Sequence, residues 1–123
     1  MEIGKKLVEF CKAGKSIEAI EKLYSPDIVS VEGMSSPTMP AEMKGIAAVK
    51  GKNEWWYQNH EVHSGTVVGP WPHGDRFIVC FKYDITAKAG KMAGQRMTID
   101  EAALYTVKND KIVKEEFFYH MGA

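Results

Sequence analysis

Apolar and polar residues alternate in three stretches of the last third of the chain: residues 76–84 (RFIVCFKYD), 97–107 (MTIDEAALYTV) and 111–120 (KIVKEEFFYH). This period of two predicts β-strands whose two faces meet different surroundings. The polar segment Lys108-Asn109-Asp110 between the last two stretches predicts a tight turn. A long antiparallel meander curls as it twists, so we expect it to wrap around helices from the N-terminal half and to enclose a pocket.

The first half of the chain adds helices and short strands. Apolar spacing and β-branched runs predict helices over residues 3–11, 17–23 and 46–60, and strands over residues 28–32 and 62–68. We expect Ser16 to cap the second helix and residues 69–75 (GPWPHGD) to form a turn. Residues 33–44 are irregular and could form a surface loop over a pocket mouth. This order predicts an α+β fold with helices on one curved sheet.

Length and charge limit the possible partners. The chain has 123 residues, with 16 Lys and Arg balanced by 16 Asp and Glu, so its formal net charge is zero. We therefore expect one domain over residues 1–123 and no binding to nucleic acid or to an anionic membrane, which would need a basic excess. No stretch approaches the ~20 apolar residues of a membrane span. The two isolated cysteines, Cys11 and Cys80, favour a reducing compartment, and we expect a cytoplasmic protein.

Three segments carry a resemblance to a known family: residues 17–20 (IEAI), 24–32 (YSPDIVSVE) and 107–115 (VKNDKIVKE). With them, nearly the whole chain resembles the nuclear transport factor 2-like superfamily, in particular its SnoaL-like and ketosteroid-isomerase-like branch, although Asp110 replaces a customary glycine. The resemblance implies a cone-shaped (cystatin-like) fold, with three N-terminal helices packed on a curved, mostly antiparallel sheet. It also implies an apolar pocket and a homodimer formed through the outer sheet face. It implies no single reaction, because such a fold hosts several.

The resemblance also assigns candidate catalytic positions. The carboxylate base of the isomerase branch, at the end of the first strand, corresponds to Glu32. The positions of that branch's two oxyanion donors correspond to Val8 and to Ala102 or Ala103, which cannot donate a side-chain hydrogen bond. The resemblance therefore favours a carboxylate base but disfavours true steroid isomerase activity. A solvated glutamate at a strand end is the alternative for Glu32.

Alternation in the predicted strand of residues 97–107 gives a second carboxylate. Glu101 shares a face with Met97 and Tyr105, whereas Asp100 lies on the opposite face. If the first of these faces lines the pocket, Glu101 joins Glu32 as a second pocket carboxylate, and two carboxylates in different environments can supply an acid and a base. A shift of one residue in the strand would place Asp100 in the pocket instead.

Aromatic and amide side chains on the predicted inner surfaces are candidate ligand-binding residues. They are Trp56, Asn59, Phe81, Tyr83, Phe117 and Tyr119. Phe117 is most simply explained by core packing, and a buried tyrosine such as Tyr119 more commonly bonds its own protein than a ligand.

The sequence contains no convincing metal or cofactor motif. His60 and His63 stand three residues apart at a helix-to-strand junction, whereas the metalloprotease helix motif needs a spacing of four and a third ligand. His120 ends the last predicted strand and could shuttle a proton. There is no phosphate-binding glycine motif and no nucleophile elbow, so we expect neither metal nor cofactor.

Two hypotheses about function remain open. The first is a cofactor-free isomerase, cyclase or dehydratase. In it Glu32, alone or together with Glu101, moves a proton on a small apolar carbonyl compound that Tyr83 and Tyr119 orient. The second is a non-catalytic ligand-binding or dimerisation module. The sequence does not decide whether the protein is an enzyme, and it does not name the substrate.

Overall fold

The computed structural model describes residues 2–33, 41–89 and 93–119 of the 123. In chain order the elements are α1 (Glu2–Lys12), α2 (Ser16–Leu23), β1 (Tyr24–Val31), β2 (Glu42–Lys44), α3 (Ile46–Asn59), β3 (His60–His73), β4 (Arg76–Ala87), β5 (Arg96–Lys108) and β6 (Lys111–Tyr119). None of the helices described could span a membrane.

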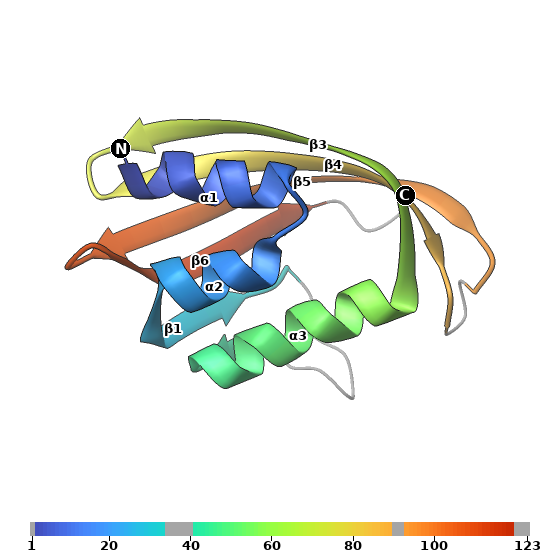
Figure 1. The fold of residues 1–123 in the computed structure, drawn as a ribbon, viewed down its shortest axis with the longest axis horizontal. Coiled ribbons are helices and arrows are strands. Elements are labelled where there is room, and N and C mark those ends of the chain that lie inside the picture. Colours follow the sequence, from blue (N-terminus) through green and yellow to red (C-terminus); the bar gives the residue numbers. More distant parts are fainter. Residues whose placement is uncertain (1, 34–40, 90–92, 120–123) are drawn as a thin grey trace.

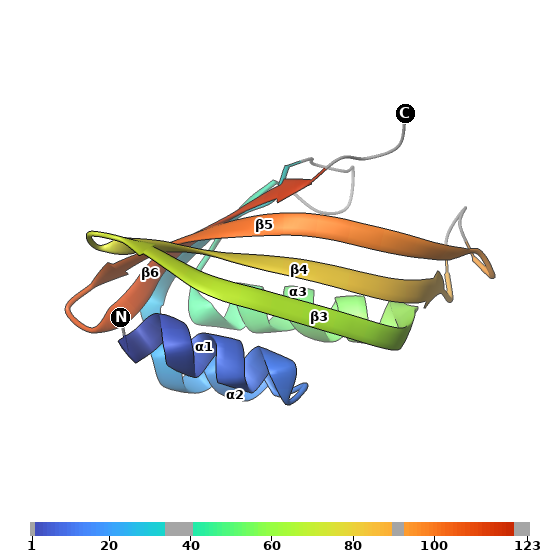
Figure 2. The same cartoon turned by 90° about the horizontal axis from the view of Figure 1, so that it is seen from above.

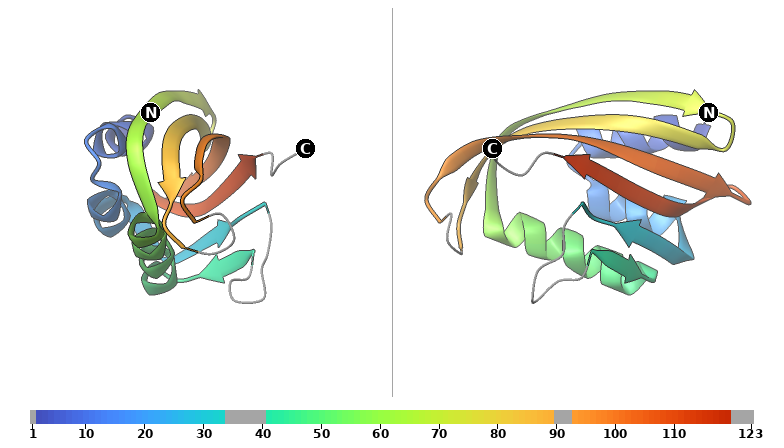
Figure 3. Two further views of the ribbon diagram at one scale, coloured as in Figure 1. Left: turned by 90° about the vertical axis from the view of Figure 1, so that its right-hand side faces the viewer. Right: turned by 180° about the vertical axis from the view of Figure 1, so that it is seen from behind.

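The strands form one curved sheet in the order β2-β1-β6-β5-β4-β3 (Figure 1). Neighbouring strands are antiparallel except β1 and β6, which run parallel near the middle of the sheet. Figure 3 shows β6 between β1 and β5, so the last strand joins the first part of the chain to the meander. The predicted α+β class and the mostly antiparallel sheet are confirmed.

All three helices lie on one side of the sheet (Figure 2). The core between these layers contains Leu7 and Val8 from α1, Ile20 from α2, Val49 from α3 and inward residues of the strands, such as Val79. Burying such apolar surface is the main source of stability in a domain of this size. The opposite face of the sheet has no helix over it among the described residues.

Cross-strand pairing defines the two faces of the sheet. Phe81 pairs with Glu101, and Glu101 pairs with Tyr119, so these three side chains share the inner face, toward the helices. One residue along, Ala102 pairs with Cys80 and Phe118 on the outer face. The register therefore decides which ionisable groups face the helices.

The structure corrects the expected end of the strand that begins after the third helix. Residues 69–73, expected to lie in a turn, belong to β3, and the turn comes later, at Gly74 and Asp75. Prolines are tolerated in edge strands, whose outer N–H groups need no partner, and β3 is an edge of this sheet. An irregularity in the register between Val68 and Trp71 accommodates this proline-rich segment.

Two other local expectations were wrong. Lys15, rather than Ser16, is the N-cap of α2, and no side chain caps this helix. Ser16 is the first helical residue, and its hydroxyl lies 3.1 Å from the Tyr57 hydroxyl. The irregular residues 33–44 include strand β2, which pairs with β1. The predicted loop over a pocket mouth falls mainly on residues 34–40, outside the described residues.

Candidate active site

A completely buried carboxyl group lies at the centre of the inner face. Glu115 on β6 is 1% exposed. Two hydroxyl groups from β1 donate to it: Ser30 Oγ lies 2.9 Å from Oε1, and the Tyr24 hydroxyl donates to Oε2. Because β1 and β6 run parallel with Ser30 beside Glu115, the central parallel pair of strands builds this contact directly.

Lys52 on α3 connects this buried carboxylate to Glu32. The Lys52 Nζ donates to Ser30 Oγ, and to Glu32 Oε1 at 3.0 Å. It lies 3.9 Å from Glu115 Oε1 and 4.9 Å from the centre of the Phe117 ring. A buried lysine needs such compensation, because removing an ammonium group from water costs several kcal/mol. The result is a continuous chain of contacts from Glu32 through Lys52 and Ser30 to Glu115.

Opposing effects act on the pKa of Glu115. Burial raises this pKa above its ordinary value, and the positive charge of Lys52 and the hydroxyl groups of Tyr24 and Ser30 oppose the rise. The two hydroxyl groups are the donors that a carboxylate requires when it leaves water, and Lys52 adds an opposite charge 3.9 Å away.

Glu101 on β5 lies next to this chain but is not bonded to it. Burial raises the pKa of Glu101 to about 7, the negative charge of Glu32 adds to the rise, and Lys52 opposes it. Among the described residues, no hydrogen bond or ion pair involves its carboxyl group. Asp100, the alternative that the sequence left open, is exposed on the outer face. Glu101 is therefore the strand's inward carboxyl group, with a pKa suited to taking and returning a proton near neutral pH.

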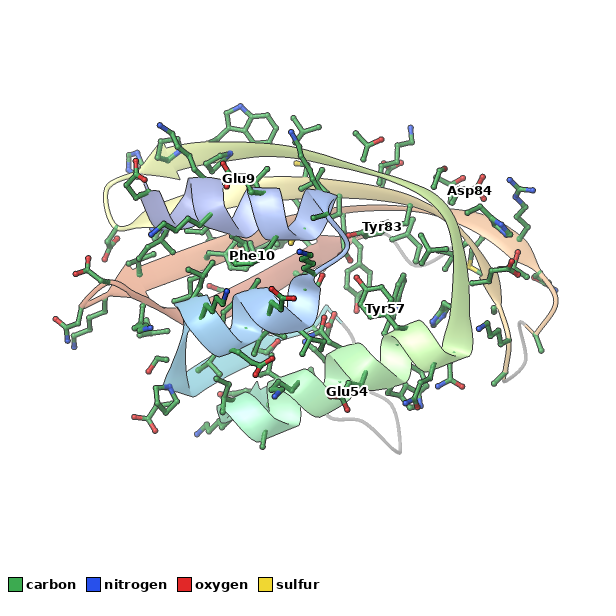
Figure 4. All side chains as sticks on the ribbon, viewed as in Figure 1. Glu9, Phe10, Glu54, Tyr57, Tyr83 and Asp84 are labelled. Atoms are coloured by element: carbon green, nitrogen blue, oxygen red, sulfur yellow. The ribbon has the colours of Figure 1, made fainter. Side chains whose placement is uncertain are left out.

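Aromatic rings border Glu101 along the inner face. Phe81 and Tyr83 on β4 stack with their centres 6.0 Å apart, and Trp56 on α3 lies 5.8 Å from Tyr83. Burial raises the pKa of Tyr83, and the nearby Tyr57 adds to this. In Figure 4, Tyr57 and Tyr83 point toward one another across the gap between α3 and the sheet. The sheet backbone leaves room for the Tyr83 ring at Gly65, where a Cβ atom would lie 2.8 Å from that ring.

The structure brings together most of the residues that the sequence proposed. Glu32, Glu101, Phe81, Tyr83, Trp56, Phe117 and Tyr119 all border the inner-face site, with Tyr119 packed near Gly33. Asn59 is different, because its amide nitrogen donates to the Trp55 carbonyl at 2.8 Å and so stabilises the end of α3. Their roles in binding or catalysis stay predictions.

Sequence reasoning missed the polar core of the site, formed by Tyr24, Ser30, Lys52 and Glu115. The signals were present but weak. Glu115 shares a strand face with two inward aromatic residues, and Lys52 lies three residues after the buried Val49 and four before Trp56, on the inward stripe of α3. A charged residue in an apolar stripe indicates a buried partner.

Two of the histidines, His60 and His63, have local partners. The Nδ1 atom of His60 lies 2.8 Å from the Trp56 carbonyl, and the Nε2 atom of His63 lies 2.6 Å from Thr86 Oγ1. Among the residues that the structure describes, no group of three His, Cys, Asp or Glu could hold a metal ion. His120, the candidate proton shuttle, is outside the described residues.

A hollow of about 730 Å³ lies mainly on the outer face, over β3 to β6. Its outer-face lining includes Val68, Cys80, Lys82, Asp100 and Phe118. The side chains of Val68 and Phe118 are 45% and 56% exposed, which is high for apolar residues on a sheet. Phe81, Glu101 and Tyr119, which belong to the inner-face site, line this hollow as well.

Comparison with known protein families agrees with this architecture. The sequence model of the SnoaL-like domain matches residues 1–119. The chain belongs to the SnoaL-like family. A search of curated proteins found no match. Among solved structures, this SnoaL-like chain is 47% identical to a Mesorhizobium loti protein provisionally named a SnoaL-like polyketide cyclase, with a TM-score of 0.88 over 96% of this chain and 97% of that one.

More distant structures show the same fold. A Catenulispora acidiphila protein with a ketosteroid isomerase-like fold, solved with trimethylamine, is 19% identical with a TM-score of 0.72 over 98% of this chain and 86% of that one. A Xanthomonas campestris protein with a cystatin-like fold is 14% identical with a TM-score of 0.75, over 98% and 89%. The SnoaL-like chain therefore has the nuclear transport factor 2-like fold predicted from its sequence. The M. loti protein's name also carries the label carbohydrate phosphatase, an unrelated reaction, so the names of relatives do not fix the chemistry.

Proposed function

We propose that this SnoaL-like protein is a cofactor-free enzyme that moves a proton on a small, neutral, largely apolar carbonyl compound. The observation that carries the proposal is the Glu101 carboxyl group, which faces aromatic rings without a counter-ion among the described residues and has a pKa of about 7. An unpaired carboxyl group with a near-neutral pKa can act as base and acid in one cycle. The protein would act in the cytoplasm, where the free thiols Cys11 and Cys80 stay reduced.

The proposed reaction passes through an enolate. The ionised Glu101 removes a proton from the carbon next to the carbonyl group, the C–H electron pair forms a C=C bond, and the carbonyl π electrons move to oxygen. The protonated Glu101 then returns the proton to a different carbon for isomerisation. Alternatively, the enolate carbon attacks a second carbonyl group, whose oxygen then takes the proton from Glu101. In a dehydration, the C–O bond of a β-hydroxyl group breaks, and its oxygen takes the proton from Glu101 and leaves as water. Glu32, another inner-face carboxylate, is a candidate for the second proton transfer, and Tyr83 and Tyr119 would orient the substrate.

The charges of the site favour a neutral substrate. Three carboxyl groups, Glu32, Glu101 and Glu115, surround Lys52, the one basic side chain that the described residues place among them. Lys52 could offset a single negative charge at one substrate oxygen, but a dianion such as a phosphate ester would add further negative charge, and like charges repel strongly at low dielectric. We therefore expect no binding of sugar phosphates.

Ligand binding and turnover are tested on one panel of compounds. Trp56 fluorescence should change with saturation when small ketones, enones or phenols bind, because Trp56 lies 5.8 Å from Tyr83 at the site. Compounds that bind are then assayed for isomerisation, cyclisation or dehydration. We expect Glu101→Gln to keep affinity within a few-fold but to lower kcat by roughly 10²–10⁴, and Glu32→Gln to lower it less. Asp100→Asn is the matched control, and full activity of Glu101→Gln would refute the mechanism.

The outer face supports a second candidate role, in association of the protein with itself. Val68, Trp71, Ile78 and Phe118 are exposed there, between 39% and 56%. Apolar patches of this kind on a soluble domain often mark interfaces. We propose a homodimer through this face, which sedimentation velocity would detect as a species of twice the 13.8 kDa chain mass. A dimer without ligand binding or turnover would favour a non-catalytic module.

A further inference from the structure

The proposed reaction needs a hydrogen-bond donor or a cation at the substrate oxygen, because negative charge develops there in the enolate. The positions where the isomerase branch carries its donors hold Val8 and Ala102 or Ala103. We propose that the Lys52 ammonium is this electrophilic group, and that Ser30 and Glu115 position it. This inference rests on the proposed function and adds a catalytic residue to it.

Hydrogen-bond counting leaves Lys52 one N–H to donate. An ammonium group has three N–H donors. Ser30 accepts one, and Glu32 accepts a second at 3.0 Å. Glu115 Oε1, at 3.9 Å, lies beyond hydrogen-bond distance. No further acceptor of Lys52 occurs among the described residues, so the third N–H is available to a carbonyl oxygen that enters beside Glu32.

The ammonium group is held in place from several directions. Ser30, which accepts from Lys52, itself donates to Glu115, and Tyr24 fixes the other Glu115 oxygen. Phe117 covers another side of Lys52, with its ring centre 4.9 Å from Nζ. Lys52 is only 9% exposed, so water screens its charge weakly. A charge already oriented before the reaction stabilises a transition state without the cost of reorganising solvent.

The tyrosines near the site are weaker candidates for this role. Burial raises the pKa of Tyr83, so its hydroxyl stays protonated and can donate only a neutral hydrogen bond. A hydrogen bond from a cation to an oxyanion is roughly twice as strong as one between neutral groups. Lys52 also lies beside Glu32, so one bound carbonyl compound could meet both a carboxylate and a cation.

The first test uses 4-nitrophenol, whose anion resembles an enolate and absorbs visible light. In the wild-type protein, we expect absorbance titration to show a pKa for the bound phenol at least one unit below that of the free phenol. Lys52→Met should remove this shift, which corresponds to about 10-fold weaker binding of the phenolate. Lys52→Arg should keep part of it. Lys50→Met is the matched control, because Lys50 is two residues away on the same helix and pairs with Glu21 at the surface.

The second test follows turnover of whichever carbonyl compound the panel identifies. We expect Lys52→Met to lower kcat by roughly 10²–10³ with a smaller effect on KM. Ser30→Ala, which keeps the ammonium but removes one of its supports, should lower kcat less and should lose part of the phenol pKa shift. A purely structural role for Ser30 would leave that shift unchanged in the folded variant.

Two results would overturn the assignment of Lys52 as the electrophilic group. It is wrong if the wild type leaves the pKa of the phenol unshifted, or if folded Lys52→Met keeps the shift and the wild-type kcat. If Lys52→Met does not fold, Lys52→Gln and Ser30→Ala decide the question by the same absorbance titration. The proposed acid–base function is judged separately by Glu101→Gln. If Glu101→Gln loses turnover but the Lys52 substitutions change neither kcat nor the pKa of the bound phenol, only the role of Lys52 is refuted.

Discussion

Neighbouring residues of the same strands lie in opposite environments on the two faces of the sheet. On the inner face, Glu115 is 1% exposed and accepts hydrogen bonds from two hydroxyl groups, whereas Phe118 on the outer face is 56% exposed. The protein thus buries charge on the side covered by helices and leaves apolar surface on the side without them. Burial of charge is costly unless every polar group is paired, and the inner face provides this pairing for Glu115 and Lys52. The outer face carries exposed apolar residues of the kind that often mark interfaces.

The largest effect should come from breaking the buried chain of contacts. Glu115→Ala leaves the Tyr24 and Ser30 hydroxyl groups without their acceptor and removes the negative charge 3.9 Å from the Lys52 ammonium. Removing one partner of a buried ion pair costs about 3–5 kcal/mol. Urea denaturation measures the loss in free energy of unfolding.

The adjacent residue is the control for this comparison. Glu116 lies on the opposite side of β6 and makes a surface contact of 3.8 Å with Lys114, so Glu116→Ala should change stability by no more than about 0.5 kcal/mol. Equal effects of the two substitutions would show that the inner and outer faces do not differ as described.

A pH-dependent effect should follow at Glu101. Below pH 4.5, its ordinary pKa, the carboxyl group is protonated in both the folded and the unfolded chain. As pH rises toward 7, the unfolded chain releases this proton first, so the folded state loses stability until its own pKa of about 7 is passed. Glu101→Gln avoids this loss. We expect it to be more stable than the wild type by about 1–3 kcal/mol at pH 8 and nearly equal at pH 4.

Thermal and urea unfolding of Glu101→Gln at both pH values would measure this difference. Asp100→Asn, the same kind of change on the outer face, should show little pH-dependent gain. A Glu101→Gln variant that is less stable than the wild type at pH 8 would mean that the carboxylate has a favourable partner, and would weaken its assignment as acid and base.

A smaller effect is expected where the sheet makes room for an aromatic ring. In Gly65→Ala the new Cβ would lie 2.8 Å from the Tyr83 ring, so the ring must move, at a cost of about 1–2 kcal/mol by analogy with other overpacked sites. Tyr83 contacts Trp56, so tryptophan fluorescence should also change. Gly51→Ala is the control, since its Cβ meets nothing within 4 Å and alanine favours a helix by up to about 1 kcal/mol.

The fold was predictable because it depends on periodicity. The alternation in residues 97–107 placed Glu101 and Asp100 on opposite faces, and the register with β4 confirmed Glu101 as the inward residue. Strand ends were less predictable: proline normally argues against a strand, but Pro70 and Pro72 lie in β3 because it is an edge strand.

The site was predictable only in part, because its polar core depends on contacts between distant segments. Glu115 and Ser30 are 85 residues apart, and they meet through the parallel pairing of β1 and β6. No local pattern predicts a parallel pair within a mostly antiparallel sheet. In the sequence, Lys52 likewise resembles an ordinary exposed helix lysine. Only the position of α3 in the fold places its ammonium group next to Glu32.

The smallest effect on folding should come from the outer face, and it separates stability from association. Phe118→Ser replaces a side chain that is 56% exposed, so the unfolding free energy of the monomer should change by no more than about 0.5 kcal/mol. If the outer face joins two copies, the same substitution should shift sedimentation velocity from dimer to monomer. Phe117→Ser, one residue earlier on the inner face, should do the reverse: it removes the ring that covers Lys52, so it should lower stability without directly affecting association. If the dimer persists in Phe118→Ser, the exposed apolar residues serve another contact. If Phe118→Ser abolishes the dimer, the outer face of the sheet serves association, separately from the carboxylate site on the inner face.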